Sequence, residues 1–125
     1  MLYQAHRGVG TEYPENTMPA FRAAVEQGYA LIELDPCFTL DGQCAILHDR
    51  TLNRTCRQTN GAPLEEPLEI EKITYAQALT YDAGVAMDAR FRGTRIPLLS
   101  EALALGKATG VTIKLDNKMQ RFSEA

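Results

Sequence analysis

The amino-acid sequence predicts an α/β fold with parallel strands, and three observations indicate this class. Short apolar segments alternate with segments of helical periodicity. Residues 29–35 are apolar enough to be covered on both faces, as parallel strands are. Ionisable residues follow three of the expected strands, at the strand ends where α/β folds place their sites. A length of 125 residues with 45% apolar and 23% charged residues is typical of one globular domain.

Residues 2–5 form the first expected strand. A helix follows, which Asn16 or Thr17 can cap and Gly28 ends. Its apolar residues recur at positions i, i+3 and i+4, namely Phe21, Ala24 and Val25. Residues 29–35 form the second strand, so this part of the chain predicts a right-handed strand–helix–strand unit.

The middle of the chain predicts a short hairpin and then an insertion. Asp41 and Gly42 indicate a turn between extended segments 37–39 and 44–47, which carries His48 back toward the end of the second strand. Residues 52–95 show poor periodicity and are expected to cover a site. Within them, Thr74 is expected to cap a short helix that reaches residue 79, and residues 84–93 are expected to be a loop.

A last helix and strand complete the pattern. Ser100 is expected to cap the helix and Gly110 to end it, and residues 111–115 form the third strand. Gly106 inside this helix costs about 1 kcal/mol relative to alanine, so packing must compensate for it.

Charge and composition exclude several classes of protein. A net charge of −3 and a pI near 5.4, without a basic stretch, argue against a general nucleic-acid or membrane-surface binder. No run of about 18 apolar residues occurs, so we expect neither a membrane span nor a signal peptide. Three cysteines without CxxC spacing predict idle thiols in a reducing compartment. The expected location is therefore cytoplasmic.

Two carboxylates at the end of the second strand predict a metal site. Glu33 and Asp35 are two residues apart, so they share one face of the strand and can converge. Two inward carboxylates repel each other and need a cation or a proton to coexist. Oxygen ligands without a cysteine cluster favour a hard divalent cation, either Mg²⁺ or Ca²⁺.

Other ionisable residues at the strand ends are weak evidence when each is taken alone. His6 with Arg7 fits a hydrogen-bonded structural pair, His48 with Asp49 a loop pair, and Asp116 with Lys118 a local salt bridge. Their shared position at strand ends favours a functional site, because the strand ends of α/β folds gather at one face.

Together these groups suit phosphodiester hydrolysis. Arg7 can bind a phosphate in a bidentate manner, and Lys118 can add a point charge as negative charge builds in the transition state. Of the two histidines, one can activate the nucleophile and the other can protonate the leaving alkoxide.

Several motifs make the chain resemble a known family. They are HRG at 6–8, PENT at 14–17, IELD at 32–35, LDG at 40–42 and HDRTLNRT at 48–55, with DAG at 82–84, FRGTRIPLLSEAL at 91–103 and DNK at 116–118 agreeing more loosely. In order and spacing they resemble the glycerophosphodiester phosphodiesterase family over nearly the whole chain. The joint presence of HRG, PENT, ExD and HD is very specific.

The resemblance implies a fold and an activity. Residues 1–125 would be the N-terminal part of a (β/α)8 TIM barrel of the phospholipase C-like phosphodiesterase type. This part would hold the first three strands, with an insertion at about 52–95 after the second strand that helps bind the glycerol group. The implied reaction cleaves a small-molecule glycerophosphodiester to an alcohol and sn-glycerol 3-phosphate.

The same resemblance implies residue roles. His6 and His48 match the acid/base pair, Glu33 and Asp35 match the metal ligands, and Arg7 matches the phosphate-binding arginine. The remaining implied members of the site are Asp116 as a third metal ligand, with Lys118 and Glu15 as substrate-binding or site-lining groups. Asn16 is interpreted as a helix cap.

Two features depart from the family pattern. Asp116 stands where the family has glutamate, so its metal contact is expected to be weak or water-mediated. A (β/α)8 barrel takes about 250 residues, and this chain supplies three of the eight strands. Unpaired strand edges would favour self-association or pairing with a complementary fragment.

Two alternatives remain open at this level. The chain could be a non-catalytic fragment or an oligomerising remnant of the same fold. It could also be a related barrel phospholipase, which pairs two histidines but acts through a cyclic phosphate. Detection of free glycerol 3-phosphate without a cyclic phosphate would separate this last option.

Overall fold

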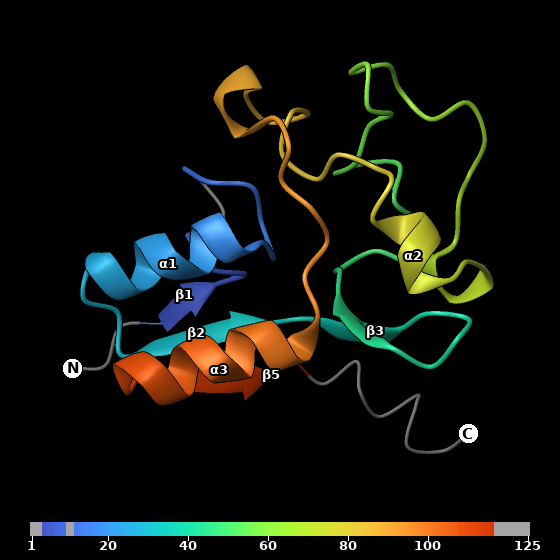
Figure 1. Ribbon diagram of the computed structural model, residues 1–125. Coiled ribbons are helices and arrows are strands. Elements are labelled where there is room, and N and C mark those ends of the chain that lie inside the picture. Colours follow the sequence, from blue (N-terminus) through green and yellow to red (C-terminus); the bar gives the residue numbers. More distant parts are fainter. Residues whose placement is uncertain (1–3, 10–11, 117–125) are drawn as a thin grey trace.

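The computed structural model describes residues 4–9 and 12–116 (Figure 1). The strands are β1 (Gln4–His6), β2 (Leu31–Leu34), β3 (Pro36–Phe38), β4 (Cys44–Ile46) and β5 (Thr112–Leu115). The α-helices are α1 (Met18–Glu26), α2 (Tyr75–Ala78) and α3 (Leu99–Thr109), and two short 3₁₀ helices are η1 (Ile70–Lys72) and η2 (Ala89–Phe91).

The predicted parallel sheet is present. Its strand order is β1-β2-β5, and every pairing in it is parallel. The register places His6, Glu33 and Lys114 side by side across the three strands. The described part of the first strand starts at Gln4, so residues 2 and 3 of the predicted strand lie outside the described residues.

One face of this sheet is covered by helices. Figure 1 shows α1 and α3 on the same side of the three strands. Ile32 and Leu34 of β2 point to that side and are fully buried against Phe21 of α1 and Ala102 of α3. Because side chains alternate along a strand, Glu33 lies on the opposite face. The alternation therefore separates a packed core from a polar face.

The start of α1 differs from the prediction. Thr17 occupies the N-cap position, but its hydroxyl donates to the carbonyl oxygen of Pro14 at 2.6 Å and does not cap the helix. Asn16 is no cap either, because its side chain is buried against Asp35. Gly28 ends the helix as expected, with a left-handed backbone (φ 84°).

Helix α3 also begins differently from the prediction. Ser100 was expected to cap it, but the N-cap residue is Leu98. The carboxylate of Glu101 accepts the Leu98 backbone N–H at 3.0 Å, so a carboxylate one turn along the helix makes the serine unnecessary. Gly106 is buried where an added Cβ would lie 3.0 Å from Ile113, which explains the glycine inside this helix.

The middle of the chain has its own hydrophobic core. Strands β3 and β4 form the predicted antiparallel hairpin, with Gly42 at its turn (φ 78°). Residues from the expected insertion pack against this hairpin in a cluster that comprises Cys37, Ala45, Leu47, Leu52, Cys56, Ile70, Ile73, Ala78, Ala83 and Ile96. The insertion is thus a packed unit despite its poor periodicity. Its apolar residues pack against the hairpin, and this packing requires no regular spacing along the sequence.

Two local predictions in the insertion had different outcomes. Thr74 does cap α2, since its hydroxyl accepts the Gln77 N–H at 3.2 Å. Residues 84–93 are not entirely loop, because η2 lies within them. The buried carboxylate of Asp82 organises this segment by accepting the N–H groups of Gly84 at 2.8 Å and Gly93 at 2.7 Å.

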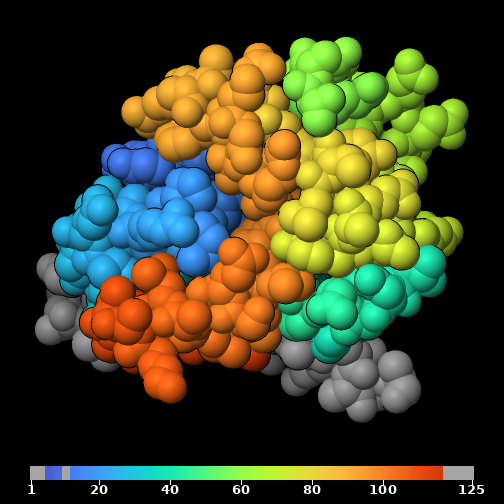
Figure 2. Space-filling model, viewed as in Figure 1, coloured from blue at the N-terminus to red at the C-terminus, as the bar shows by residue number. Residues whose placement is uncertain are grey.

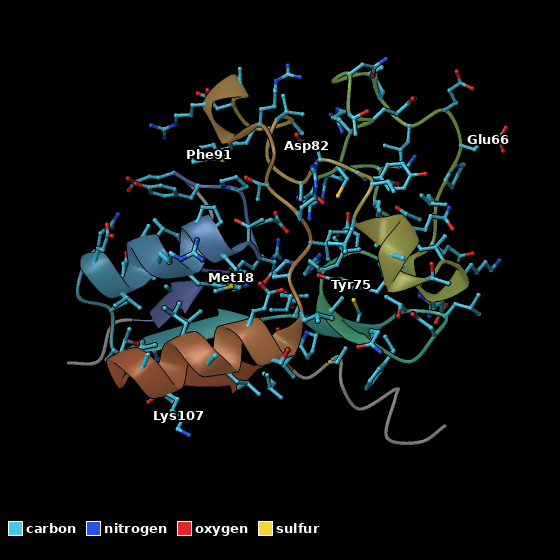
Figure 3. The ribbon with its side chains drawn as sticks, in the orientation of Figure 1. Met18, Glu66, Tyr75, Asp82, Phe91 and Lys107 are labelled. Atoms are coloured by element: carbon cyan, nitrogen blue, oxygen red, sulfur yellow. The ribbon has the colours of Figure 1, made fainter. Side chains whose placement is uncertain are left out.

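The segment after η2 joins the two cores. Figure 2 shows it, in orange, running over the surface between α1 and α2 down to α3. Tyr75, labelled beside it in Figure 3, donates its hydroxyl to the carbonyl oxygen of Ile96 at 2.7 Å. Within the described residues, none of the helices is long and apolar enough to cross a membrane.

Candidate active site at the strand ends

Three polar side chains lie side by side on the face of the sheet opposite the helices. His6 Nε2 is 3.4 Å from one carboxylate oxygen of Glu33, and the Lys114 ammonium is 3.7 Å from the other. The side chain of His6 is 61% exposed, whereas that of Glu33 is 15% exposed. The largely buried carboxylate therefore lies between an accessible histidine and a lysine.

Arg7 adopts a backbone conformation that is uncommon for a side chain of its size. Its φ is 57°, in the left-handed region, and its N–H donates to the carbonyl oxygen of Glu33 at 2.6 Å. The carbonyl oxygen of Arg7 accepts the N–H of Asn16 at 2.9 Å. These bonds hold the chain in a turn directly after β1, where strained residues often serve function.

Gly8 lets this turn lie against α1. It has φ 78°, and an added Cβ would lie 2.7 Å from the Cβ of Ala20. A residue with a side chain would both strain the backbone and collide with the helix. The HRG motif thus combines two site residues with a glycine that the packing requires.

Asp35 is the buried carboxylate of the site, 2% exposed. Its Oδ2 accepts the side-chain amide of Asn16 at 2.9 Å and lies 3.5 Å from Nε of Arg7. Its Oδ1 is buried without a hydrogen-bond partner among the described residues. An orphaned buried carboxylate oxygen is unusual, because such a group costs free energy unless something ligates it.

Glu15 lies between two arginines. Its carboxylate is 3.2 Å from Nη1 of Arg7 and accepts two hydrogen bonds from Arg54, at 2.8 and 2.9 Å. Burial would raise the pKa of Glu15, but the hydrogen bonds from Arg54 and the charge of Arg7 outweigh it and leave the pKa lowered. Glu15 is therefore ionised at neutral pH.

His48 is joined to the same network through Asp49. Nδ1 of His48 is 2.7 Å from Oδ1 of Asp49, and Arg54 donates to the Asp49 carboxylate at 2.8 and 3.1 Å. The hydrogen bonds from Arg54, followed by the contact with His48, lower the pKa of Asp49 to about 2. An ionised carboxylate accepts only, so a neutral His48 ring that faces Asp49 carries its proton on Nδ1.

The predicted metal ligands are distributed as follows. Glu33 contacts His6 and Lys114. Asp35 contacts Asn16 and Arg7. The backbone N–H of Asp116 donates to the Leu34 carbonyl oxygen at 2.9 Å, which places residue 116 level with Asp35. In residues 4–9 and 12–116, no group of three or more His, Cys, Asp or Glu side chains converges closely enough to hold a metal ion. The Oδ1 atom of Asp35 still fits a cation ligand in its chemistry and burial.

Comparison with the sequence-based predictions shows which residues meet. His6 meets Glu33, and Arg7 meets both Glu15 and Asp35. Lys118 lies outside the described residues.

Four residues that contact this group were not predicted as site residues. Asn16, interpreted as a helix cap, contacts Asp35, and Asp49, interpreted as one of a loop pair with His48, also contacts Arg54; Lys114 at Glu33 and Arg54 itself had no predicted role. A signal was available for Lys114, because a lysine two residues before Asp116 shares its strand face. Arg54 is the second of two arginines in the HDRTLNRT motif, and the sequence alone does not indicate that it contacts Glu15 and Asp49.

A small hollow opens beside this network. It measures about 200 Å³, and its lining residues are Pro14, Glu15, Arg54, Thr55, Ala83, Ala86 and Met87. The insertion at 52–95 therefore supplies most of the lining of a space next to the charged groups.

Taken together, the fold and site define a parallel α/β protein with a charged site at the carboxyl ends of its strands. A sequence model of the Glycerophosphoryl diester phosphodiesterase family matches residues 6–125. The chain belongs to this family, and its α/β fold is part of a (β/α)8 barrel, as predicted.

Curated relatives agree with this assignment. A glycerophosphodiester phosphodiesterase of Caldanaerobacter subterraneus subsp. tengcongensis is 41% identical over 104 residues, which cover 83% of this chain and 40% of the relative. One of Bacillus altitudinis is 38% identical over 121 residues, which cover 94% and 46%. The chain therefore spans less than half the length of these relatives.

Solved structures give the same family. A glycerophosphodiester phosphodiesterase from Agrobacterium tumefaciens has a TM-score of 0.77 at 32% identity, covering 92% of this chain and 47% of that one. An Oleispira antarctica phosphodiesterase, solved in complex with the product sn-glycerol-3-phosphate, has a TM-score of 0.81 at 30% identity, covering 92% and 43%.

Proposed function

We propose that this chain supplies the N-terminal part of a phosphodiesterase that hydrolyses glycerophosphodiesters to an alcohol and sn-glycerol 3-phosphate. One observation supports the proposal above the others: Arg7, in the turn after β1, contacts both Glu15 and Asp35, the latter at the end of β2. This is the charged, partly buried arrangement that binding a phosphate and a cation together requires. The product bound to the Oleispira relative is consistent with it.

We propose His6 and His48 as the acid/base pair. His6 is accessible and is oriented by Glu33, and His48 has its Nδ1 oriented by Asp49. One ring would take the proton of the attacking water while the other gives a proton to the departing alkoxide. Each histidine thus has a carboxylate partner that fixes which nitrogen acts.

Substrate binding is proposed for Arg7, with Glu15 and Lys118 as the other contacts. A guanidinium group can donate two parallel hydrogen bonds to a phosphate. Arg7 Nε is buried without a hydrogen-bond partner among the described residues, although it lies 3.5 Å from Asp35 Oδ2. A buried donor of this kind is suited to an anionic ligand.

A divalent cation, Mg²⁺ or Ca²⁺, is proposed as the cofactor, held by Glu33 and Asp35 with Asp116. The orphaned Oδ1 of Asp35 supports this assignment. When bound, such a cation would offset the charge of the phosphate and of the two carboxylates. Residue 116 is level with Asp35 at the neighbouring strand end, where a third oxygen ligand is expected.

An assay of hydrolysis tests the proposed function. The 125-residue chain is incubated with glycerophosphocholine or glycerophosphoethanolamine and millimolar Mg²⁺ or Ca²⁺, and free sn-glycerol 3-phosphate is measured. The same assay is run on a chain extended by the remaining strands of the barrel. We expect slow release from the 125-residue chain and faster release from the extended chain, because a (β/α)8 barrel needs all its strands.

Two results would contradict the proposal. Absence of product from the extended chain would favour the non-catalytic alternative. A cyclic phosphate product would favour the barrel phospholipase alternative, in which the substrate's own hydroxyl and not water attacks phosphorus.

The proposal includes partners and location. In the described part of the sheet, β1 and β5 are the edge strands, so self-association or pairing with a complementary fragment is proposed for the 125-residue chain. A cytoplasmic location is proposed from the free thiols, of which Cys37 and Cys56 are buried.

A further inference from the structure

Arg54 contacts both halves of the candidate site. Its Nη1 and Nη2 atoms donate to the two oxygens of Glu15 at 2.8 and 2.9 Å. Its Nε and Nη2 atoms donate to the two oxygens of Asp49 at 2.8 and 3.1 Å. Each carboxylate therefore receives a two-pronged contact from the same guanidinium group, the strongest geometry for an arginine–carboxylate pair.

This arrangement leaves Arg54 little capacity to bind a substrate itself. A guanidinium group has five N–H donors, and the four contacts to Glu15 and Asp49 occupy four of them. Two ionised carboxylates also neutralise its charge. Arg54 is thus positioned to orient other residues and not to bind a phosphate.

Each carboxylate passes the contact on to a group with a proposed chemical role. Asp49 holds Nδ1 of His48 at 2.7 Å, and Glu15 holds Nη1 of Arg7 at 3.2 Å. The series His48, Asp49, Arg54, Glu15 and Arg7 is therefore continuous, and Glu15 and Arg54 are 39 residues apart in the chain.

A role in stability alone accounts for this network poorly. The side chain of Arg54 is 49% exposed, and exposed ion pairs contribute little to folding. An orienting role can have a larger effect. Removal of a group that holds a functional side chain in place typically lowers activity by about 10- to 100-fold, even when that group does not touch the substrate.

We propose that Arg54 is the positioning residue that orients the base His48 and the phosphate-binding Arg7 together. It does so through Asp49, which keeps the His48 proton on Nδ1, and through Glu15, which holds the Arg7 guanidinium. This inference rests on the proposed function for the roles of His48 and Arg7. The contacts that carry it are independent of that function.

The test measures the His48 tautomer, which needs no catalysis. Long-range ¹H–¹⁵N NMR of the 125-residue chain identifies the protonated ring nitrogen in the unaltered protein and in Arg54→Gln, Arg54→Lys and the control Arg50→Gln. Arg50 is an exposed arginine of the same loop, and its charge acts on Glu69, which lies outside the network that Arg54 joins. Binding of sn-glycerol 3-phosphate is titrated in parallel.

We expect Arg54→Gln to lose the predominance of the Nδ1–H tautomer and to weaken sn-glycerol 3-phosphate binding by about 10-fold or more. Arg54→Lys should be intermediate, because an ammonium group cannot hold both carboxylates in two-pronged geometry. Arg50→Gln should match the unaltered chain. An unchanged tautomer in a folded Arg54→Gln chain would overturn the proposal.

Single-arm variants keep the proposal testable if Arg54→Gln fails to fold. Asp49→Asn should change the His48 tautomer and spare ligand binding through Arg7, whereas Glu15→Gln should do the reverse. Identical effects of the two variants would contradict separate arms. Failure of the extended chain to hydrolyse glycerophosphodiesters, with these NMR results intact, would reject the proposed function but not the positioning role.

Discussion

At the scale of single residues, positive and negative side chains alternate through the site. Glu15 lies between Arg7 and Arg54, and Asp49 lies between Arg54 and His48. The carboxylates of Glu15 and Asp49 both contact the guanidinium group of Arg54, and contact between opposite charges lowers the cost of burying them in part. Asp35 keeps one buried oxygen outside this pattern of pairs.

Replacement of either histidine should lower turnover sharply. In the extended, active chain, His6→Ala and His48→Ala should each reduce kcat by about two to four powers of ten, the usual effect of a general acid or base. The thermal unfolding midpoint should change little, because neither side chain belongs to a hydrophobic core. Unchanged kcat in His48→Ala would remove that residue from the catalytic pair.

Cation binding should depend on Glu33. Millimolar Ca²⁺ or Mg²⁺ should raise the thermal unfolding midpoint, since a ligand that binds the folded state stabilises it by mass action. Glu33→Gln should abolish this rise, whereas the control Glu26→Gln, an exposed position at the end of α1, should retain it. Calorimetry that detects no binding at millimolar cation would contradict the metal assignment.

Acid should destabilise the chain in a window set by Asp49. Its pKa falls from 3.8 to about 2 on folding, so the stabilisation is fully present above about pH 4 and is lost as the pH falls toward 2. Denaturant unfolding between pH 5 and pH 2 measures this loss. The slope in that window should be shallower in Asp49→Asn and in Arg54→Gln, which removes the cause of the lowered pKa. An undiminished slope in both variants would argue against the pairing.

At the scale of elements, the site depends on how tightly the turn after β1 lies against α1. Gly8 and Gly42 have the same φ of 78°, but an added Cβ meets Ala20 at 2.7 Å at Gly8 and nothing within 4 Å at Gly42. A side chain at either glycine would strain the left-handed backbone, but only a side chain at Gly8 would also collide with α1. Comparison of the two positions therefore gives the free-energy cost of the collision alone.

Gly8→Ala should destabilise the fold more than Gly42→Ala does. The left-handed backbone costs about 1–2 kcal/mol at either position. Overpacking against Ala20 should add about 1–3 kcal/mol at Gly8. Urea unfolding of both variants measures the difference, and equal losses of unfolding free energy would mean that α1 yields to the added methyl group.

At the scale of the whole molecule, two hydrophobic cores adjoin at β4, where Ala45 belongs to one core and Ile46 to the other. One lies between the parallel sheet and helices α1 and α3, and the other joins the β3–β4 hairpin to the insertion. The Glu15–Arg54 pair crosses between them. The parallel sheet exposes its edge strand β5 and, on the face opposite helices α1 and α3, its polar side chains.

The 125-residue chain should therefore self-associate, because the edge of β5 offers backbone groups to another strand. Sedimentation velocity at increasing concentration should show dimers or larger species. Leu115→Lys on β5 should weaken association, whereas Leu103→Lys on α3, where the leucine is similarly exposed (48% against 41%), should not. A compact monomer at all concentrations would contradict this prediction.

The sequence by itself determined the order of the strands and helices and the strand ends after which the candidate site residues lie. Periodicity and turn residues predicted the strand–helix–strand unit, the hairpin turn at Gly42 and the cap at Thr74, because these depend on contacts within a few residues. The alternation of side chains along β2 likewise placed Glu33 on the polar face, but it did not predict that Glu33 and Asp35 contact different partners. The starts of α1 and α3 were predicted less well, since Thr17 donates to Pro14 and does not cap α1, and Leu98 instead of Ser100 is the N-cap residue of α3.

Tertiary structure alone decided which charges meet. Asn16 was predicted as a cap but binds Asp35, 19 residues further along, and Arg54 meets Glu15 across 39 residues. The insertion owes its order to apolar contacts with the hairpin, which no periodicity within it reveals. Such contacts join residues that are far apart in the sequence. They form only because the folded chain brings these residues close together, and local sequence patterns do not contain this information.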